Sequence, residues 1–388
     1  MADFKTVDKK YVANTYNRFD VEISRGKGAY AYDKDGKEYV DMGTGIGVNA
    51  FGYCDEVWLD AVKEQLSKIQ HTSNLYYTKP CSDLAQILCE KTGFSKVFFS
   101  NSGAEANECA IKVARKYACD KYGENRYNVI TLKNSFHGRT ITTLSATGQD
   151  VFHTKFKPLT EGFLYVDAND FDGLKECVEN NEVAAIMLEC VQGEGGVLVL
   201  DEEYVKNVAN FAKERDILLI VDEVQTGNGR LGTLYGYMNY GITPDVITTA
   251  KGLGGGLPIG ATLLSKKVEN VLAFGDHGST FGGNPVACAG AISIINRLTD
   301  DFLAEVAKKG EFIKQTLKGC KGILSVSGKG LMIGIETSRP AKEVVLDCIK
   351  EGVLCLTAKT KVRLLPPLNI SYETLTVALD VIKNVCAK

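Results

Sequence analysis

The stretch LLIVDEVQTG (218–227), followed by VITTAKGLGGG (246–256), decides how this chain folds. Each segment opens with a short run of apolar and β-branched residues and then meets a charge, Asp222 in the first and Lys251 in the second. Such runs are typical of strands buried on both faces of a parallel sheet. We therefore expect both charges at the carboxyl edge of one sheet, where open α/β folds bind their ligands.

The same pattern continues on both sides of this stretch. Amphipathic helical patterns, such as those over 104–121 and 202–215, separate the candidate strands. This alternation indicates βα units and a largely parallel sheet. The candidate strands are residues 97–100, 128–132, 163–166, 184–189, 218–223, 246–250 and 260–265.

The predicted secondary structure at the two ends of the chain differs from that at its centre. Residues 20–42 predict a small antiparallel hairpin with a turn at DKDG (33–36). We expect an α/β protein with a large domain (50–285), whose mostly parallel sheet is covered by helices. A smaller α+β domain is then built from both chain ends (1–49 and 286–388), and the cleft between the domains is a natural ligand site.

Composition excludes several classes of protein. The 388 residues carry a net charge of −3 with both signs mixed, which argues against a nucleic-acid binder. No apolar run is long enough to span a membrane, and the first ten residues lack the apolar core of a secretory signal. The 12 scattered cysteines indicate free thiols in a reducing cytoplasm, and the four histidines do not cluster with them as metal ligands do.

Ser102, Gly103 and Ala104 lie where the strand at 97–100 gives way to a helix. Small residues at a helix start let unpaired N–H groups face outward, which suits an anion such as phosphate. Taken alone this signal is weak, because any strand–helix junction can carry Ser-Gly.

Asp222 and Lys251 each suggest a specific chemistry. A carboxylate at the end of a buried strand is costly unless it is paired, and either a protonated heterocyclic nitrogen or a structural salt bridge could pair with Asp222. A lysine that closes an apolar strand is desolvated, which favours its nucleophilic neutral amine over a solvated surface charge. The glycines follow Lys251, so the spacing is not that of a nucleotide-binding loop.

Together the three features match the needs of one cofactor. Pyridoxal 5'-phosphate requires an anion site, a carboxylate for its ring nitrogen and a lysine that binds it covalently. The phosphate site, the acidic residue and the lysine follow one another in that order along a single predicted sheet. The conjunction is far more specific than any of its parts.

On these and further motifs the sequence resembles the class III (ornithine-type) aminotransferases, which have the type I pyridoxal-phosphate fold. The resemblance extends from about residue 15 to about residue 370. It rests on GTGIGVNAFGY (43–53), SGAEANECAIKVARKY (102–117), FHGRT (136–140), GEGG (193–196), LLIVDEVQTGNGR (218–230), AKGLGGGLPIGA (250–261), GDHGSTFGGNP (275–285) and RLLPPL (363–368).

The resemblance implies a role for each motif residue. Lys251 is expected to bind the cofactor and to move the proton during transfer, while Asp222 holds the ring nitrogen protonated. His137 is expected to position its neighbours. Thr280 is expected to reach the cofactor phosphate of a partner subunit, which implies a homodimer with active sites at the interface. The other implied cofactor contacts are Gly103, Ala104, Phe136, Glu223, Val224 and Gln225.

Four residues are expected to select substrates. Arg139 would take the α-carboxylate of N2-acetylornithine, and Ser279 lies near the same end of the site. Arg363 would take the carboxylate of 2-oxoglutarate next to the reacting carbon. Glu194 would neutralise Arg363 while the amine donor is bound and swing away when 2-oxoglutarate enters.

The resemblance implies transfer of the distal amino group of N2-acetylornithine to 2-oxoglutarate, in arginine biosynthesis. Ornithine, N-succinylornithine, N-succinyldiaminopimelate and 4-aminobutyrate stay open as alternative donors. An aminomutase or a decarboxylase would keep the fold, but the combination of Arg139, Glu194 and Arg363 favours glutamate as the shuttle. A non-catalytic cofactor-binding protein would not need both Lys251 and Asp222.

Overall fold

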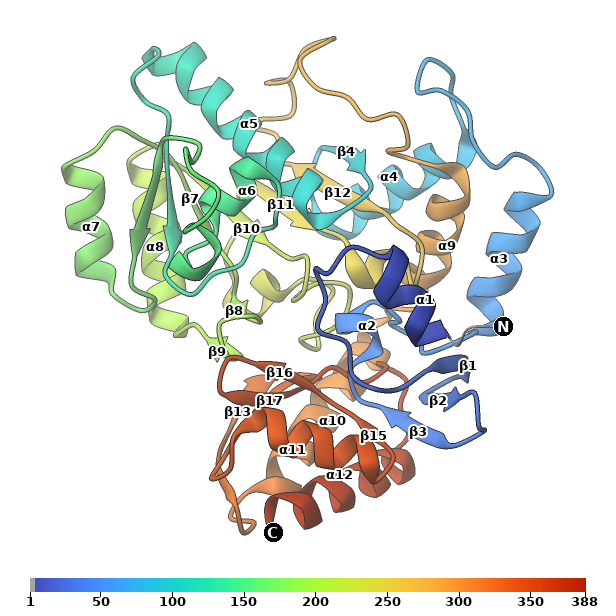
Figure 1. The fold of residues 1–388 in the computed structure, drawn as a ribbon. Helices are drawn as coiled ribbons and strands as arrows, with labels where there is room; N and C mark the ends of the chain where they lie inside the picture. Colours follow the sequence, from blue (N-terminus) through green and yellow to red (C-terminus); the bar gives the residue numbers. More distant parts are fainter. Residues whose placement is uncertain (1–3) are drawn as a thin grey trace.

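The computed structural model describes residues 4–388, which form a large unit around a seven-stranded sheet and a smaller unit beneath it (Figure 1). The sheet has the order β4-β12-β11-β10-β7-β5-β6. All neighbours from β11 to β6 pair in parallel, and only β12 runs against its neighbours. The strands are β4 (Lys96–Ser100), β5 (Asn128–Leu132), β6 (Phe163–Val166), β7 (Val183–Leu188), β10 (Leu218–Asp222), β11 (Val246–Thr249) and β12 (Gly260–Leu264).

This sheet confirms the predicted α/β fold, and each strand begins and ends within one residue of its expected position. Burial explains the agreement, because β7, β10, β11 and β12 are buried along their whole length. A strand buried on both faces must be apolar throughout, so its limits are visible in the sequence.

Helices cover both faces of the sheet. On one face α5 (Gly103–Tyr122) packs Cys109, Ala110, Val113 and Ala114 against β7, β10 and β11. On the other face α8 (Glu202–Glu214) contributes apolar side chains at helical spacing. The remaining helices of this unit are α3 (Glu56–Leu66), α4 (Lys79–Thr92), α6 (Ile141–Ala146), α7 (Phe171–Glu179) and α9 (Pro285–Ile295), with the short 3-10 helices η1 (Asp150–Phe152), η2 (Gly236–Tyr240) and η3 (Lys251–Leu253).

The smaller unit joins the two ends of the chain, as the sequence predicts. Strands β1 (Ile23–Lys27), β2 (Tyr30–Asp33) and β3 (Glu38–Asp41) form a sheet whose fourth member is β15 (Val353–Leu354). The β15 strand pairs in parallel with β3. The predicted simple hairpin over 20–42 was therefore incomplete, since the turn at 33–36 joins β2 and β3 and a further strand precedes them.

The C-terminal residues complete this unit with a second four-stranded sheet, in the order β13-β14-β17-β16. Its strands are β13 (Ile323–Lys329), β14 (Met332–Thr337), β16 (Leu356–Ala358) and β17 (Lys361–Leu364), and its helices are α10 (Asp300–Leu317), α11 (Ala341–Lys350) and α12 (Tyr372–Cys386). The helix α9 packs on α3 and α4 of the large unit, so the domain limits at 49 and 285 stay a prediction. Four short elements lie outside these three sheets: α1 (Phe4–Tyr11), α2 (Thr44–Gly47), and β8 (Val191–Gln192) and β9 (Leu198–Val199), which pair with each other.

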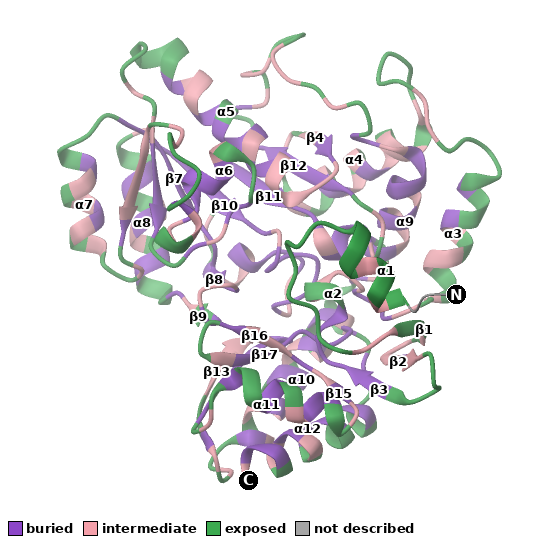
Figure 2. Cartoon of the chain, viewed as in Figure 1, coloured by how far each residue is buried: buried purple, intermediate pink, exposed green. Residues whose placement is uncertain are grey.

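Burial follows these layers, with buried residues concentrated in the central strands and on the inner faces of the helices (Figure 2). All 12 cysteines are free thiols, as predicted. Within residues 4–388, every helix is too short or too polar to cross a membrane.

Candidate active site

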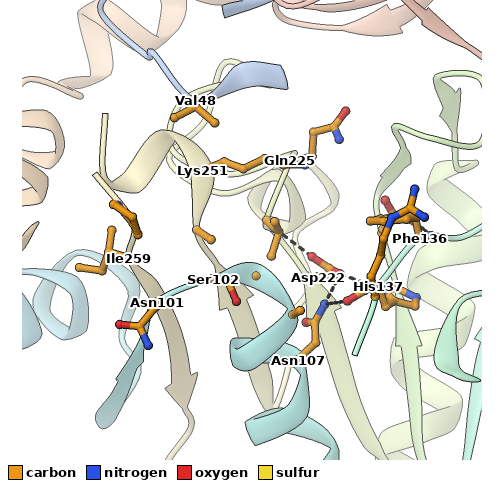
Figure 3. Close-up of a pocket in the computed structure, with 18 of the residues that line it drawn as sticks. Val48, Asn101, Ser102, Asn107, Phe136, His137, Asp222, Gln225, Lys251 and Ile259 are labelled. Atoms are coloured by element: carbon orange, nitrogen blue, oxygen red, sulfur yellow. Dashed lines mark hydrogen bonds and ion pairs between the residues drawn. The ribbon is translucent and has the colours of Figure 1, made fainter. Parts of the chain in front are cut away.

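A cavity of about 480 Å³ opens at the carboxyl ends of the central strands (Figure 3). Asp222 ends β10, Lys251 follows β11, and Ser102 follows β4 at the start of α5, so the sheet brings the three expected groups to one edge. The two charges that the sequence places after separate strands therefore share one cavity.

Lys251 occupies a tight turn directly after β11. Its backbone is left-handed, with φ of 45°, and the preceding Ala250 carbonyl accepts a hydrogen bond from Asn228 Nδ2 at 3.1 Å. Asn228 Nδ2 also donates to the Thr249 hydroxyl at 2.9 Å, and the two hydrogen bonds hold the turn in place. Burial lowers the pKa of Lys251, although Glu194 and Asp222 oppose the shift. The amine is therefore biased towards its neutral, nucleophilic form.

Asp222 is buried and its carboxylate is held by three donors. Its Oδ2 atom accepts hydrogen bonds from His137 Nδ1 and Asn107 Nδ2, both at 2.8 Å. Its Oδ1 atom accepts the N–H of Val224 at 2.9 Å. The amide of Asn107 is oriented in turn, because its Oδ1 atom accepts the hydroxyl of Thr248 at 2.6 Å. Three donors stabilise a carboxylate against burial.

His137 supports Asp222 and does not face the cavity as a free base. The Asp222 carboxylate only accepts, so the proton between the two side chains belongs to His137 Nδ1. Burial disfavours an imidazolium, yet the hydrogen bond and charge of Asp222 outweigh burial and raise the pKa of His137. This contact supports the positional role that the sequence suggests.

The start of α5 forms the third side of the cavity. Ser102 caps the helix by accepting the N–H of Glu105 at 3.2 Å, which leaves the N–H groups of Gly103 and Ala104 in the first turn without helical acceptors. A Cβ atom on Gly103 would lie 2.5 Å from a methyl carbon of Val224, so only glycine lets the helix start approach so closely. The site is suited to an anion.

Phe136 and Arg139 line the same cavity from the segment after β5. The N–H of Phe136 is fixed by Glu189 Oε2 at 3.0 Å. The Arg139 guanidinium lies 5.6 Å from the centre of the Phe136 ring and 4.7 Å from that of Phe152. Arg139 has no carboxylate partner among residues 4–388, so its charge is free to meet an anionic ligand.

A second arginine, from the small unit, contacts Gln225, which lines the cavity. Arg363 of β17 is only 2% exposed and donates to Glu194 Oε1 at 2.5 Å and to Gln225 Oε1 at 3.0 Å. Burial alone would raise the pKa of Glu194, but the charge and hydrogen bond of Arg363 lower it. The side chain of Glu194 is 29% exposed, so it can leave this contact more readily than Arg363 can.

This constellation agrees with the comparison to protein families. A family model described as "Aminotransferase class-III" matches residues 11–386.

The chain is a class III aminotransferase.

Named relatives of this aminotransferase cover nearly its whole length. The acetylornithine aminotransferase of Haemophilus ducreyi is 52% identical over 386 residues, which are 99% of this chain and 98% of the relative. That of Caldanaerobacter subterraneus subsp. tengcongensis is 47% identical, with 99% of both chains covered.

Solved aminotransferase structures share the fold. The ornithine aminotransferase of Toxoplasma gondii superposes with a TM-score of 0.94 at 32% identity, covering 99% of this chain and 94% of its own, and it holds PLP at partial occupancy in its active site. The N-acetylornithine aminotransferase of Stenotrophomonas maltophilia superposes with a TM-score of 0.86 at 33% identity, with 98% of both chains covered.

Five expected site residues of the aminotransferase are not part of the cavity lining in the single chain. Two of them, Glu194 and Arg363, contact the lining residue Gln225. The other three are Glu223, Ser279 and Thr280. Glu223 turns away, and its carboxylate accepts the Thr226 hydroxyl and two backbone N–H groups of η2. Ser279 accepts a hydrogen bond from Asn101 Nδ2 at 3.2 Å, and Thr280 is exposed on the loop that follows β12. By contrast Gly103, Ala104, Phe136, Val224 and Gln225 all line the cavity.

Sequence reasoning missed two residues of the site. Asn107 lies on the inner face of α5, where nothing in the sequence distinguishes it from other small residues. Glu189 directly follows β7 and lines the cavity. The signal that pointed to Asp222, a carboxylate at the end of an apolar strand, was present for Glu189 too. Glu189 was missed because the predicted strand (184–189) included it.

Proposed function

We propose that this aminotransferase transfers the distal amino group of N2-acetylornithine to 2-oxoglutarate, with pyridoxal 5'-phosphate bound at Lys251. The products are N-acetylglutamate 5-semialdehyde and glutamate, as in arginine biosynthesis. The observation that carries the proposal is the convergence of Lys251, Asp222 and the start of α5 on one cavity. The acetylornithine aminotransferases at 52% and 47% identity support the choice of substrate.

The residues that line the cavity fit the chemistry of this cofactor. The N–H groups of Gly103 and Ala104 suit its phosphate, and Asp222 presents a carboxylate held by three donors to a protonated ring nitrogen. Phe136 offers an aromatic face, and Gln225 and Lys251 both line the cavity (Figure 3). When bound, the cofactor supplies an electron sink for the electrons released at the reacting carbon.

The protein's own groups then divide the work. The neutral amine of Lys251 can take a proton from the reacting carbon and deliver it to a different atom. Asp222 presents its carboxylate to the ring nitrogen of the cofactor. Arg139 offers two parallel donors to the α-carboxylate of the amine donor.

The pair of Arg363 and Glu194 adapts the site to two substrates. With the amine donor bound, Glu194 neutralises the buried guanidinium of Arg363. When 2-oxoglutarate enters, its carboxylate can replace Glu194, since both are anions that suit the same donor. A mutase or a decarboxylase would have no use for such an exchange, which favours transamination with glutamate as the shuttle.

We also propose a homodimer that completes the site with Thr280. The chain exposes a patch of large apolar side chains, with Leu75, Tyr76 and Tyr77 exposed by 86%, 70% and 102%. Asn74 ties this segment to the loop of Thr280 by donating to the carbonyls of Ser279 and Gly282, each at 2.9 Å. Exposed aromatic patches of this kind mark interaction surfaces, and a second copy of the chain is the partner that the proposed site requires.

Absorbance spectroscopy tests the reaction. The visible band of the cofactor bound to the purified enzyme should fall when N2-acetylornithine is added and return when 2-oxoglutarate follows. Ornithine, 4-aminobutyrate and N-succinyl donors, assayed in the same way, should bleach the band more slowly. A band that no amine donor bleaches would overturn the proposal.

A further inference from the structure

Two buried carboxyl groups lie next to each other at the edge of the sheet. Strands β7 and β10 pair in parallel with Leu188 opposite Val221. Glu189, directly after β7, and Asp222, the last residue of β10, therefore come at neighbouring positions. Their residues are only 5% and 3% exposed, and both line the cavity. Two carboxylates so close together in a buried site cannot both ionise at low cost.

Hydrogen bonds decide which of the two keeps its charge. Asp222 receives three donors, from His137, Asn107 and the Val224 backbone. Glu189 receives one, the N–H of Phe136 at 3.0 Å. Donors stabilise the charged form of a carboxyl group, so Asp222 has more hydrogen bonds to support a carboxylate than Glu189 has.

The surroundings of Glu189 also favour its protonated form. The pKa of Glu189 is raised to about 8, mainly by burial and also by the charge of Asp222. His137, from the segment after β5, and Lys251, from η3 after β11, oppose it. Arg139 is the other charged side chain lining the cavity from the segment of Phe136.

We propose that Glu189 works as a neutral carboxylic acid, which accepts the N–H of Phe136 with one oxygen and offers its own O–H to an oxygen atom of the bound ligand. Glu189 is thus a positioning residue, and Asp222 is the only carboxylate at this corner of the site. The inference rests on the proposed function, since the ligand is the cofactor with its substrate.

The variant Glu189→Gln tests whether Glu189 acts as a neutral acid or as a carboxylate. Glutamine keeps an acceptor for Phe136 and a donor for the cavity, and it is neutral at every pH. We expect glutamine to slow the N2-acetylornithine half-reaction at pH 7 less than leucine does at the same position, because one neutral donor replaces another. The decline of the wild-type rate above about pH 8 should be absent in the variant.

Glu189→Leu is the matched loss of function, since leucine leaves the N–H of Phe136 unpaired. We expect its half-reaction to slow by about tenfold or more. Glu203→Gln, on the surface at the start of α8, controls for an added amide and should change nothing. A loss of about 100-fold in Glu189→Gln at pH 7, with the cofactor still bound, would overturn the inference, because a neutral side chain would then fail where the carboxylate works.

A second measurement needs neither cofactor nor turnover. Folded Glu189 keeps its proton up to about pH 8, whereas an unfolded glutamate releases it near 4.5. The free energy of unfolding of the wild type should therefore fall relative to that of Glu189→Gln as the pH rises from about 4.5 to about 8. Above about pH 8 the difference between the two proteins should stay constant. A melting-temperature difference that does not change over this range would overturn the neutral acid. If instead the wild type fails to use N2-acetylornithine while this gap appears, the proposed function fails and the neutral acid stands.

Discussion

Arg363 and Glu194 come from separate units of the fold, 169 residues apart in the chain, and their charged atoms meet at 2.5 Å. Arg363 is almost fully buried, so it depends on Glu194 and Gln225 for its partners. Removing one partner of a buried ion pair leaves the other charge uncompensated, which is costly. The pair is therefore a point at which substitution should affect one half of the reaction more than the other.

Glu194→Gln should slow the amine-donor half-reaction about tenfold more than the glutamate half-reaction. In the first half the variant leaves Arg363 without an anion, whereas in the second the substrate carboxylate supplies one. Single-turnover kinetics of both halves measure the ratio, with Glu202→Gln at the exposed start of α8 as control. Equal losses in both halves would show that Glu194 does not exchange with substrate.

Arg139→Lys should raise the KM for N2-acetylornithine by about 10- to 100-fold, because a lysine cannot make two parallel hydrogen bonds to a carboxylate. N-acetylputrescine lacks only that carboxylate, and its KM should hardly change. Arg25→Lys is the control, since Arg25 also lies over an aromatic ring, at 3.7 Å from the centre of Tyr32, but on the surface. If the variant weakens both donors alike, Arg139 does not bind the carboxylate.

Lys251→Met should stabilise the cofactor-free protein at pH 7 by about 1–2 kcal/mol, since functional groups are often held at a cost in stability. Burial lowers the pKa of Lys251 below the 10.5 of an unfolded lysine. As the pH rises through this lowered pKa towards 10.5, folded Lys251 loses its proton first, and the wild type recovers stability relative to the variant. Thermal unfolding across this pH range should show the gap closing, whereas exposed Lys266→Met should show no gap. A gap that widens with pH would contradict the shift.

Mixing two inactive variants tests whether Thr280 acts across a dimer interface. Lys251→Ala lacks the covalent lysine, and Thr280→Ala lacks the proposed contact to the partner's phosphate. If both are unfolded and refolded together, hybrid dimers contain one site with an intact Lys251 and an intact Thr280, and activity should return. Each variant refolded alone should stay at its low level. No recovery, with hybrid dimers present by native mass spectrometry, would place Thr280 in its own subunit's site.

The sequence predicts the fold and the catalytic edge well where burial constrains the residues. Strands β7, β10 and β11 must be apolar throughout, so polar residues at their ends, such as Asp222 and Lys251, are conspicuous. The same reasoning could have found Glu189, which follows β7 in the same manner. The prediction ended that strand one residue late and hid it.

What the sequence could not predict depends on contacts between distant segments. The hydrogen bonds from Asn107 to Asp222 and from Arg363 to Gln225 span 115 and 138 residues. Neither has a local pattern, because such pairs are set by how helices and strands pack and not by spacing along the chain. The antiparallel direction of β12 is equally invisible, since a fully buried strand has the same composition in either direction.

The parallel pairing of β3 with β15 has a consequence for how the protein is made. Val40 leaves the ribosome well before its partner Val353 does. At typical elongation rates, roughly 15–60 s separate the two. During that interval β3 lacks the strand with which it pairs in parallel. The nascent chain thus presents an early demand for a chaperone that shields β3 until Val353 has emerged.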